Sequence, residues 1–156
     1  MKTLILYFTK TGHTLEAAEA VAEGIRAAGS EVALTAVADF DATLPADCDA
    51  FIVASPCWAG SAGVPMFPKP MERALAGLAA DALTGKRCGG VSVHAGVGGE
   101  NTVELIGTTL ASKACSDYRP GPVARAGVPF SLWKGPSVKP EDEAAFKAYG
   151  TTFAGE

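Results

Sequence analysis

ILYFTKTGHT, residues 5–14, is the stretch that decides the fold expected for this chain. The apolar run from Leu4 to Phe8 shows no polar alternation, which is typical of a strand buried on both faces of a parallel sheet. Apolar residues then recur at helical spacing as far as Ile25. Residues 9–14 are therefore expected to connect the carboxyl end of a buried strand to the N-terminus of a helix.

The segment 9–14 has the chemistry of a phosphate-binding loop. Free backbone N–H groups and the positive end of the helix dipole attract anions at such a place. Thr9, Thr11 and Thr14 supply hydroxyl donors, and Gly12 lets the backbone approach closely. The loop lacks both the Gly-Lys-Ser/Thr ending of a nucleoside-triphosphatase loop and the spaced glycines of a dinucleotide fingerprint. A single terminal monophosphate fits best, and the alternative is a hydroxyl-rich turn that merely caps the helix.

The same stretch resembles the N-terminal signature of the flavodoxin family, which fixes residue types over 17 positions. The matching residues are Ile5, Thr9, Gly12, Thr14, Ala18 and Val21. The resemblance implies that this loop holds the phosphate of FMN, and it makes the predicted cofactor-binding residues Thr9, Lys10, Thr11, Gly12, His13 and Thr14. Lys10 and His13 occupy variable positions of the signature, so we expect both to be solvated loop residues rather than phosphate ligands.

Strands alternate with helices along the chain, which predicts an α/β fold with a doubly wound parallel sheet. Strands are expected at residues 4–8, 31–37, 50–54 and 88–93, with only a short fifth strand within 114–130. Helices are expected at about 15–25, 69–80, 100–113 and from residue 140 onward. The flavodoxin resemblance implies a five-stranded sheet in the order 2-1-3-4-5. In such sheets ligands bind beyond the carboxyl ends of the strands, here at strands 1 and 3.

Length and composition narrow the classes of function. The 156 residues are expected to form one domain, 1–156, with a substantial core. The net charge of −4, without a Lys/Arg cluster, argues against nucleic-acid binding. The absence of a signal sequence and of any apolar run near 18 residues argues against secretion and membrane insertion. The four cysteines form no C-x-x-C pair, so we expect reduced, mostly buried thiols and a cytoplasmic protein.

A second predicted cofactor loop follows the third strand. Its residues are Ser55, Pro56, Cys57, Trp58, Ala59 and Gly60. Trp58 matches the aromatic residue that packs on the isoalloxazine ring in flavodoxins; the alternative is a Trp folded over the loop's own surface. In the family, a peptide just after this aromatic accepts a hydrogen bond from flavin N5, and Gly is often found there. Ala59 stands there in this chain, which predicts weaker stabilisation of the one-electron-reduced flavin.

A third predicted cofactor loop follows the fourth strand and is rich in glycine. Its predicted binding residues are His94, Ala95, Gly96, Gly98 and Gly99. Many electron-carrying flavodoxins place a Tyr here, whereas this loop resembles that of flavodoxin-like NAD(P)H:quinone reductases. His94 either ends a strand with its ring hydrogen-bonded or helps to polarise a substrate oxygen. Trp133 either covers the flavin from a distant loop or, as we expect, anchors a long connection against the sheet.

Two functions remain after related folds are set aside. A receiver domain needs acids at the ends of strands 1 and 3, where this chain has Thr9 and Ser55, and a tyrosine phosphatase needs a Cys in the first loop. The favoured function is an FMN-binding electron carrier that serves redox partner proteins. The alternative is an FMN-dependent NAD(P)H:quinone-type oxidoreductase, for which NAD(P)H or a quinone would be the partner. The modest charge and the third loop speak for the alternative, whereas the compact chain speaks for the carrier.

Overall fold

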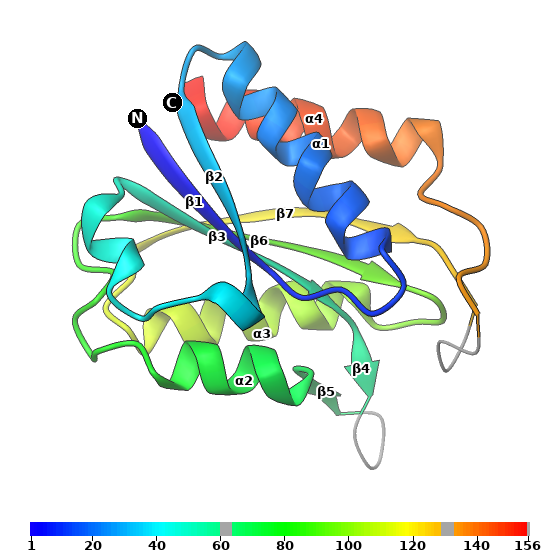
Figure 1. Cartoon of the computed structure of the whole chain (residues 1–156), viewed down its shortest axis with the longest axis horizontal. Helices are drawn as coiled ribbons and strands as arrows, with labels where there is room; N and C mark the ends of the chain where they lie inside the picture. Colours follow the sequence, from blue (N-terminus) through cyan, green and yellow to red (C-terminus); the bar gives the residue numbers. More distant parts are fainter. Residues whose placement is uncertain (60–63, 129–132, 156) are drawn as a thin grey trace.

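A five-stranded parallel sheet forms the centre of the molecule (Figure 1). The computed structural model describes residues 1–59, 64–128 and 133–155, so Gly60 of the predicted site lies outside the described residues. The strands in sheet order are β2 (Glu31–Ala36), β1 (Lys2–Tyr7), β3 (Ala50–Pro56), β6 (Arg87–His94) and β7 (Asp117–Arg125). This order confirms the doubly wound flavodoxin-like topology expected from the sequence.

Helices cover both faces of the sheet. One face carries α1 (His13–Ala27) and α4 (Pro140–Gly155), and the other carries α2 (Lys69–Ala76) and α3 (Gly99–Ala111), as Figure 1 shows. The connection from β2 to β3 contains two 3₁₀ turns, Val37–Asp39 and Leu44–Asp47. No helix in the described ranges has the length and apolar character that crossing a lipid bilayer requires.

Two hydrophobic clusters, one on each face, hold the layers together. Alternate residues of the central strands point to opposite faces, so Ile5 and Ile52 pack under α1 and α4. Leu6 and Phe51 pack on the other side with the apolar face of α3. All four side chains are completely buried. Burial on both faces is the reason that these strands read as continuous apolar runs in the sequence.

The last strand is longer than predicted. Residues 114–130 were expected to contain only a short strand because prolines and glycines interrupt them, but β7 runs for nine residues. It pairs with β6 alone and is an edge strand, where proline's missing N–H costs no ladder hydrogen bond. The register shifts between Gly90 and Ser92, which absorbs one extra residue of the Pro120–Pro122 region.

The connection after β3 is more ordered than the loop predicted for it. Strand β3 continues to Pro56, and a two-stranded antiparallel hairpin follows, made of β4 (Trp58–Ala59) and β5 (Pro65–Met66). Helix α2 ends at Ala76, although the sequence predicted an end near residue 80. The hairpin projects past the carboxyl edge of the sheet in Figure 1.

Helices α1 and α4 pack against each other through glycine. A Cβ atom on Gly24 would lie 2.0 Å from the carbonyl oxygen of Lys147. A Cβ atom on Gly150 would lie 2.1 Å from the carbonyl oxygen of Val21. Both distances are far below a van der Waals contact, so the backbones approach this closely only because neither position has a side chain.

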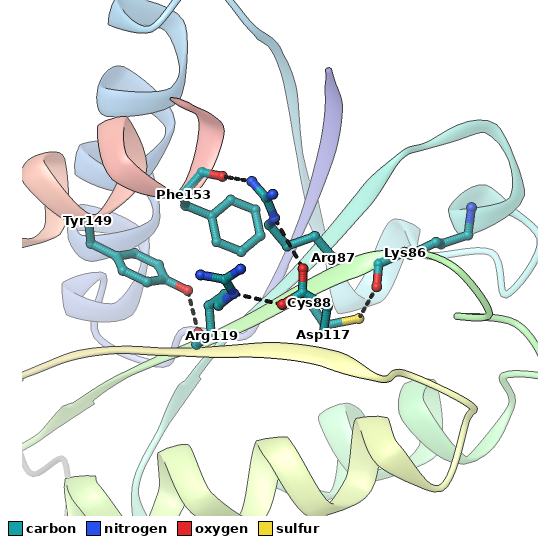
Figure 2. A network of polar contacts seen from close by, with 7 residues as sticks. All are labelled: Lys86, Arg87, Cys88, Asp117, Arg119, Tyr149 and Phe153. Carbon is teal, nitrogen blue, oxygen red and sulfur yellow. Dashed lines mark hydrogen bonds and ion pairs between the residues drawn. The ribbon is translucent and has the colours of Figure 1, made fainter. Parts of the chain in front are cut away.

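A polar network fastens the end of α4 to the amino-terminal edge of the sheet (Figure 2). Arg87 donates to the Phe153 carbonyl oxygen at 2.6 Å and contacts Asp117 at 3.4 Å, and its guanidinium lies over the Phe153 ring. Asp117 also contacts Arg119 at 2.6 Å. The Tyr149 hydroxyl donates to the Arg119 carbonyl oxygen at 2.7 Å, and burial raises the Tyr149 pKa. This network lies at the opposite end of the strands from the predicted cofactor loops.

Candidate functional site

The first loop joins β1 to α1 and leaves the helix N-terminus uncapped. Gly12 precedes the helix in a left-handed conformation, with φ of 99°, that favours glycine. Its N–H donates to the Thr9 hydroxyl oxygen at 2.9 Å, so the Thr9 hydroxyl hydrogen can still be donated elsewhere. No side chain in the described part of the molecule caps α1. The first-turn amides therefore remain available to an anion.

The donor set of this loop fits a phosphate group. Thr14 is buried in the first turn of α1, Thr11 is half-buried, and Lys10 is exposed, as expected for a solvated residue. The space beside Gly12 is open, because a Cβ atom there would meet no other atom within 4 Å. Backbone amides at a helix N-terminus together with hydroxyl groups recognise a phosphate without a fixed protein charge.

His13 is buried, which corrects the expectation that it is a solvated loop residue. Its side chain lies between two hydrogen-bond acceptors. Nε2 contacts the Lys134 carbonyl oxygen, and Nδ1 lies 3.2 Å from Oε2 of Glu16. The same Oε2 accepts a hydrogen bond from the Val138 N–H at 3.0 Å. His13 and Glu16 therefore join the cofactor loop to the segment that leads into α4.

Glu16 is held as a carboxylate by these contacts. Burial acts to raise its pKa, but the hydrogen bonds from the Val138 N–H, His13 and Ser137 outweigh burial, and the net pKa is lowered. Glu16 stands three residues after His13, a spacing at which helical side chains meet, so the sequence carried a signal for this pair. Lys134 lies 121 residues from His13, and no local pattern could have predicted their contact.

The second loop places Trp58 beside the first loop. The Trp58 ring packs edge-on against Phe8, with ring centroids 6.2 Å apart, and 37% of the residue remains exposed. The Cys57 N–H donates to the Val93 carbonyl oxygen at 3.2 Å, which ties the loop to β6. Ser55 is fully buried and donates to the Pro56 carbonyl oxygen at 3.0 Å. Trp58 thus lies at the surface of this loop.

The third loop repeats the geometry of the first. Gly98 precedes α3 with φ of 94°, and no described side chain caps that helix. The Cys57 thiol lies 3.5 Å from the Val97 carbonyl oxygen, and a Cβ atom on Gly98 would lie 3.3 Å from that sulfur. The second and third loops are therefore in contact. Within the third loop, Ala95 is half-buried and Gly96 is exposed.

His94 ends β6, which fits the first of the two roles considered for it, but the hydrogen bond of that role is not made at Nδ1. Its Nδ1 is buried without a partner among the described residues. The ring lies against the start of α3, where a Cβ atom on Gly99 would come within 2.7 Å of the His94 Cδ2. The absence of a side chain at Gly99 is what makes room for this ring.

Trp133 does not anchor the connection before α4, contrary to the prediction. The residue is 67% exposed. The anchoring contacts are made by the backbone instead: the Lys134 carbonyl oxygen with His13, and the Gly127 N–H with the Pro136 carbonyl oxygen at 2.8 Å. Backbone groups carry no residue-specific signal in a sequence, so this segment's role could not be predicted.

Comparisons with known proteins agree with this architecture. The flavodoxin family model matches residues 5–94, more than half of the chain. The flavodoxin of Streptococcus pneumoniae TIGR4 has a TM-score of 0.78 at 22% identity, and the match covers 99% of this chain and 98% of the flavodoxin. The two-electron-reduced flavodoxin of Megasphaera elsdenii has a TM-score of 0.74 at 19% identity, covering 97% and 98%. Oxidised flavodoxin 1 of Bacillus cereus has a TM-score of 0.73 at 17% identity, covering 98% and 97%.

A search of curated protein sequences found no match. The three structures named above are all flavodoxins, so the predicted likeness of the third loop to NAD(P)H:quinone reductases is not confirmed.

Proposed function

The chain belongs to the flavodoxin family and is an FMN-binding electron-transfer protein, and we propose that residues 9–14 hold the FMN phosphate. The observation that carries this proposal is the uncapped N-terminus of α1 behind Gly12. The backbone N–H groups of His13 and Thr14 and the hydroxyls of Thr9 and Thr14 would hold the phosphate. When bound, FMN supplies the redox chemistry, and the protein supplies position and exclusion of water.

The flavin ring would lie between the second and third loops. Trp58 offers an aromatic face that is partly exposed and is positioned by Phe8. Stacking on such a ring contributes about 0.5–1.5 kcal/mol beyond burial of area. Gly96 is exposed and a Cβ atom there would meet nothing within 4 Å, so the backbone of the third loop can approach a planar ring closely at this residue. Electrons would leave through the exposed edge of the flavin ring toward a redox partner protein.

Titration of the apoprotein with FMN and with riboflavin tests the phosphate site. We expect one FMN per chain and far weaker binding of riboflavin, which lacks the phosphate. Thr14→Val should weaken FMN binding by about 1–3 kcal/mol, because a hydroxyl that pairs with the phosphate is lost. The matched control is Thr108→Val, an exposed hydroxyl on α3, which should leave the FMN Kd unchanged. Equal affinities for FMN and riboflavin would overturn the proposal.

Anaerobic mixing of the FMN-loaded protein with NADPH or NADH separates a carrier from a reductase. A carrier should keep its yellow colour, because it takes electrons from a protein. Rapid bleaching would instead support the NAD(P)H-dependent oxidoreductase.

A further inference from the structure

The buried imidazole of His13 faces a hydrogen-bond acceptor on each side. Its Nε2 contacts the Lys134 carbonyl oxygen, and its Nδ1 lies 3.2 Å from Oε2 of Glu16. Only 4% of the residue is exposed, so water cannot replace either partner. The carbonyl oxygen has no hydrogen to donate, and the lowered pKa of Glu16 keeps that side chain a carboxylate. Neither partner can therefore donate a hydrogen bond to the ring.

Two acceptors require two ring protons. A neutral imidazole carries one N–H and one lone pair, and here the lone pair would point at an oxygen atom whichever nitrogen held the proton. A buried lone pair that faces another oxygen has no partner, which disfavours the neutral ring. The doubly protonated imidazolium makes both contacts and pairs its charge with Glu16.

The His13 ring lies in a slot that two glycines leave open. A Cβ atom on Gly127 would come within 3.0 Å of the His13 Cδ2 and 3.3 Å of its Nε2. A Cβ atom on Gly135 would come within 2.8 Å of the Gly127 backbone. The Gly127 N–H donates to the Pro136 carbonyl oxygen at 2.8 Å, which holds the two sides of the slot together. The packing therefore sets which atom each ring nitrogen faces.

Among the described residues, Glu16 is the charged group that contacts this ring. The segments packed around it also carry cations, and all of these are exposed: Lys10, Arg125, Lys134 and Lys139. Residues 126–128 contain no titratable side chain. His94 is linked to the same segment, because its carbonyl oxygen accepts the Ala126 N–H at 3.0 Å. Solvent screens the exposed cations, so Glu16 dominates the electrostatic environment of His13.

The His13 charge lies where the FMN phosphate is proposed to bind. The backbone N–H of the same residue belongs to the uncapped first turn of α1, so an anion bound there cannot be far from the ring. The helix dipole disfavours a cation in the first turn, because that end of the helix is itself positive. A phosphate dianion offsets the dipole and attracts the imidazolium. Phosphate binding and protonation of His13 therefore favour each other.

We propose that His13 is a proton-dependent positioning residue of the phosphate site. With both ring protons it holds the first loop against residues 134–138 and adds a positive charge beside the phosphate. This inference rests on the proposed FMN-binding function. Loss of one proton removes the charge and one of the two contacts, which leaves the hydrogen bond from the Val138 N–H to Glu16 at 3.0 Å. FMN should therefore bind most tightly while His13 is doubly protonated, and its affinity should fall as rising pH removes that proton.

Nitrogen-15 NMR of the imidazole rings reads the protonation state independently of activity. The chain has two histidines, so His94→Gln assigns the His13 signals. In the FMN-loaded protein at neutral pH, we expect the two similar nitrogen shifts and two N–H protons of an imidazolium. In Glu16→Gln the new amide can donate to Nδ1, so one ring proton suffices and the two shifts should differ. A neutral His13 ring in the wild type would overturn the proposal while the FMN-binding function stands.

The pH dependence of the FMN Kd tests the coupling. Measurements run from about pH 7 to 8.5, where a phosphate monoester is already largely a dianion. Every protein carries Cys57→Ser, so that this thiol beside the cofactor loops does not titrate. One coupled proton weakens binding by at most about tenfold per pH unit, and we expect the Kd of the wild type to rise at least about threefold over this range. The rise should persist in His94→Gln and be absent in His13→Gln.

Glu16→Gln gives a second variant if His13→Gln fails to fold. Its His13 no longer needs the second proton, so the Kd should be level over the same range. A level Kd in the wild type, a rise that persists in His13→Gln, or a rise that only His94→Gln abolishes would each overturn the proposal. Failure to bind FMN would instead remove the proposed function and the coupling with it, whereas the ring spectrum of the apoprotein would still show whether His13 holds both contacts.

Discussion

At the scale of single residues, the candidate site depends on a few positions that fix the backbone conformation or hold two loops together. Gly12 and Gly98 each allow a helix to begin behind a left-handed residue, which points uncapped amides toward the loops. His13 and Glu16 then fix the first loop to the last segment. Ala59 stands where the flavodoxin resemblance leads us to expect a glycine, and it lies in β4 opposite Pro65.

Ala59 is expected to tune the two reduction steps of the flavin. An alanine resists a conformation with positive φ by roughly 1 kcal/mol relative to glycine. Ala59→Gly should therefore raise the first one-electron reduction potential by roughly 40 mV and lower the second by a similar amount. Stepwise anaerobic reduction with reference dyes measures both potentials, and Ala42→Gly, in the exposed connection before β3, is the control. Unchanged potentials in Ala59→Gly would contradict this argument.

The Glu16 carboxylate should make stability depend on pH in the acidic range. Its pKa is lowered in the folded protein, so its contribution is fully present above the ordinary value of 4.5 and is lost as pH falls through the lowered pKa. Urea unfolding of the wild type and Glu16→Gln should show their largest difference in unfolding free energy above pH 4.5. The difference should shrink at lower pH. Glu19→Gln, exposed on the same helix, should show no such trend.

At the element scale, the crossing of α1 and α4 determines where the last helix lies. The two glycines at this crossing let the helix backbones touch, and α4 in turn covers the sheet face that holds Ile5 and Ile52. The β4–β5 hairpin has a different role, because it presents Trp58 and Met66 outward instead of covering the core. Helices therefore bury the sheet, whereas short strands and loops provide the surface for function.

Gly150→Ala should destabilise the protein by about 1–3 kcal/mol, because the added methyl group would overlap the Val21 carbonyl oxygen. The helix-propensity gain of about 1 kcal/mol does not offset this overlap. Gly155→Ala, in the same helix, is the matched control, since its Cβ atom would meet nothing within 4 Å. Thermal or urea unfolding compares the two. A Gly150→Ala protein as stable as wild type would show that the helices separate at little cost.

At the scale of the whole molecule, the two ends of the parallel strands have different roles. The amino-terminal ends of the strands carry the Arg87 network that fastens the end of α4 (Figure 2). The carboxyl ends carry the loops proposed to hold the cofactor. Strand direction is the reason for this separation, because all five strands are parallel and all their carboxyl ends meet at one edge. Changes that affect stability and changes that affect function should therefore be separable.

Arg87→Met tests this separation. The substitution leaves the Phe153 carbonyl without its donor and Asp117 without one partner, so we expect a loss of about 1–3 kcal/mol in unfolding free energy. The FMN Kd of the folded protein should stay unchanged. Lys147→Met removes only the exposed pair with Glu23 and should cost less than about 1 kcal/mol. A large rise in the FMN Kd of Arg87→Met would show that the two edges are coupled.

Features that depend on local chemistry could be predicted from the sequence. The buried runs of β1 and β3, the helix after Thr14 and the glycine before it follow from periodicity and backbone preference within a few residues. These patterns, with the flavodoxin resemblance, were sufficient for the sheet order and for the cofactor. The position of the third loop could also be predicted from the sequence, but the surroundings of the His94 ring could not be predicted.

Features that depend on residues distant in the chain could not be predicted and follow from the packing of the folded protein. His13 is buried between Lys134 and Glu16, and the nine-residue β7 pairs with β6. Trp133 is exposed, while backbone groups fasten its segment to the rest of the molecule. Local patterns report a residue's own preference, whereas burial and neighbouring charge arise from the packing of residues many positions away.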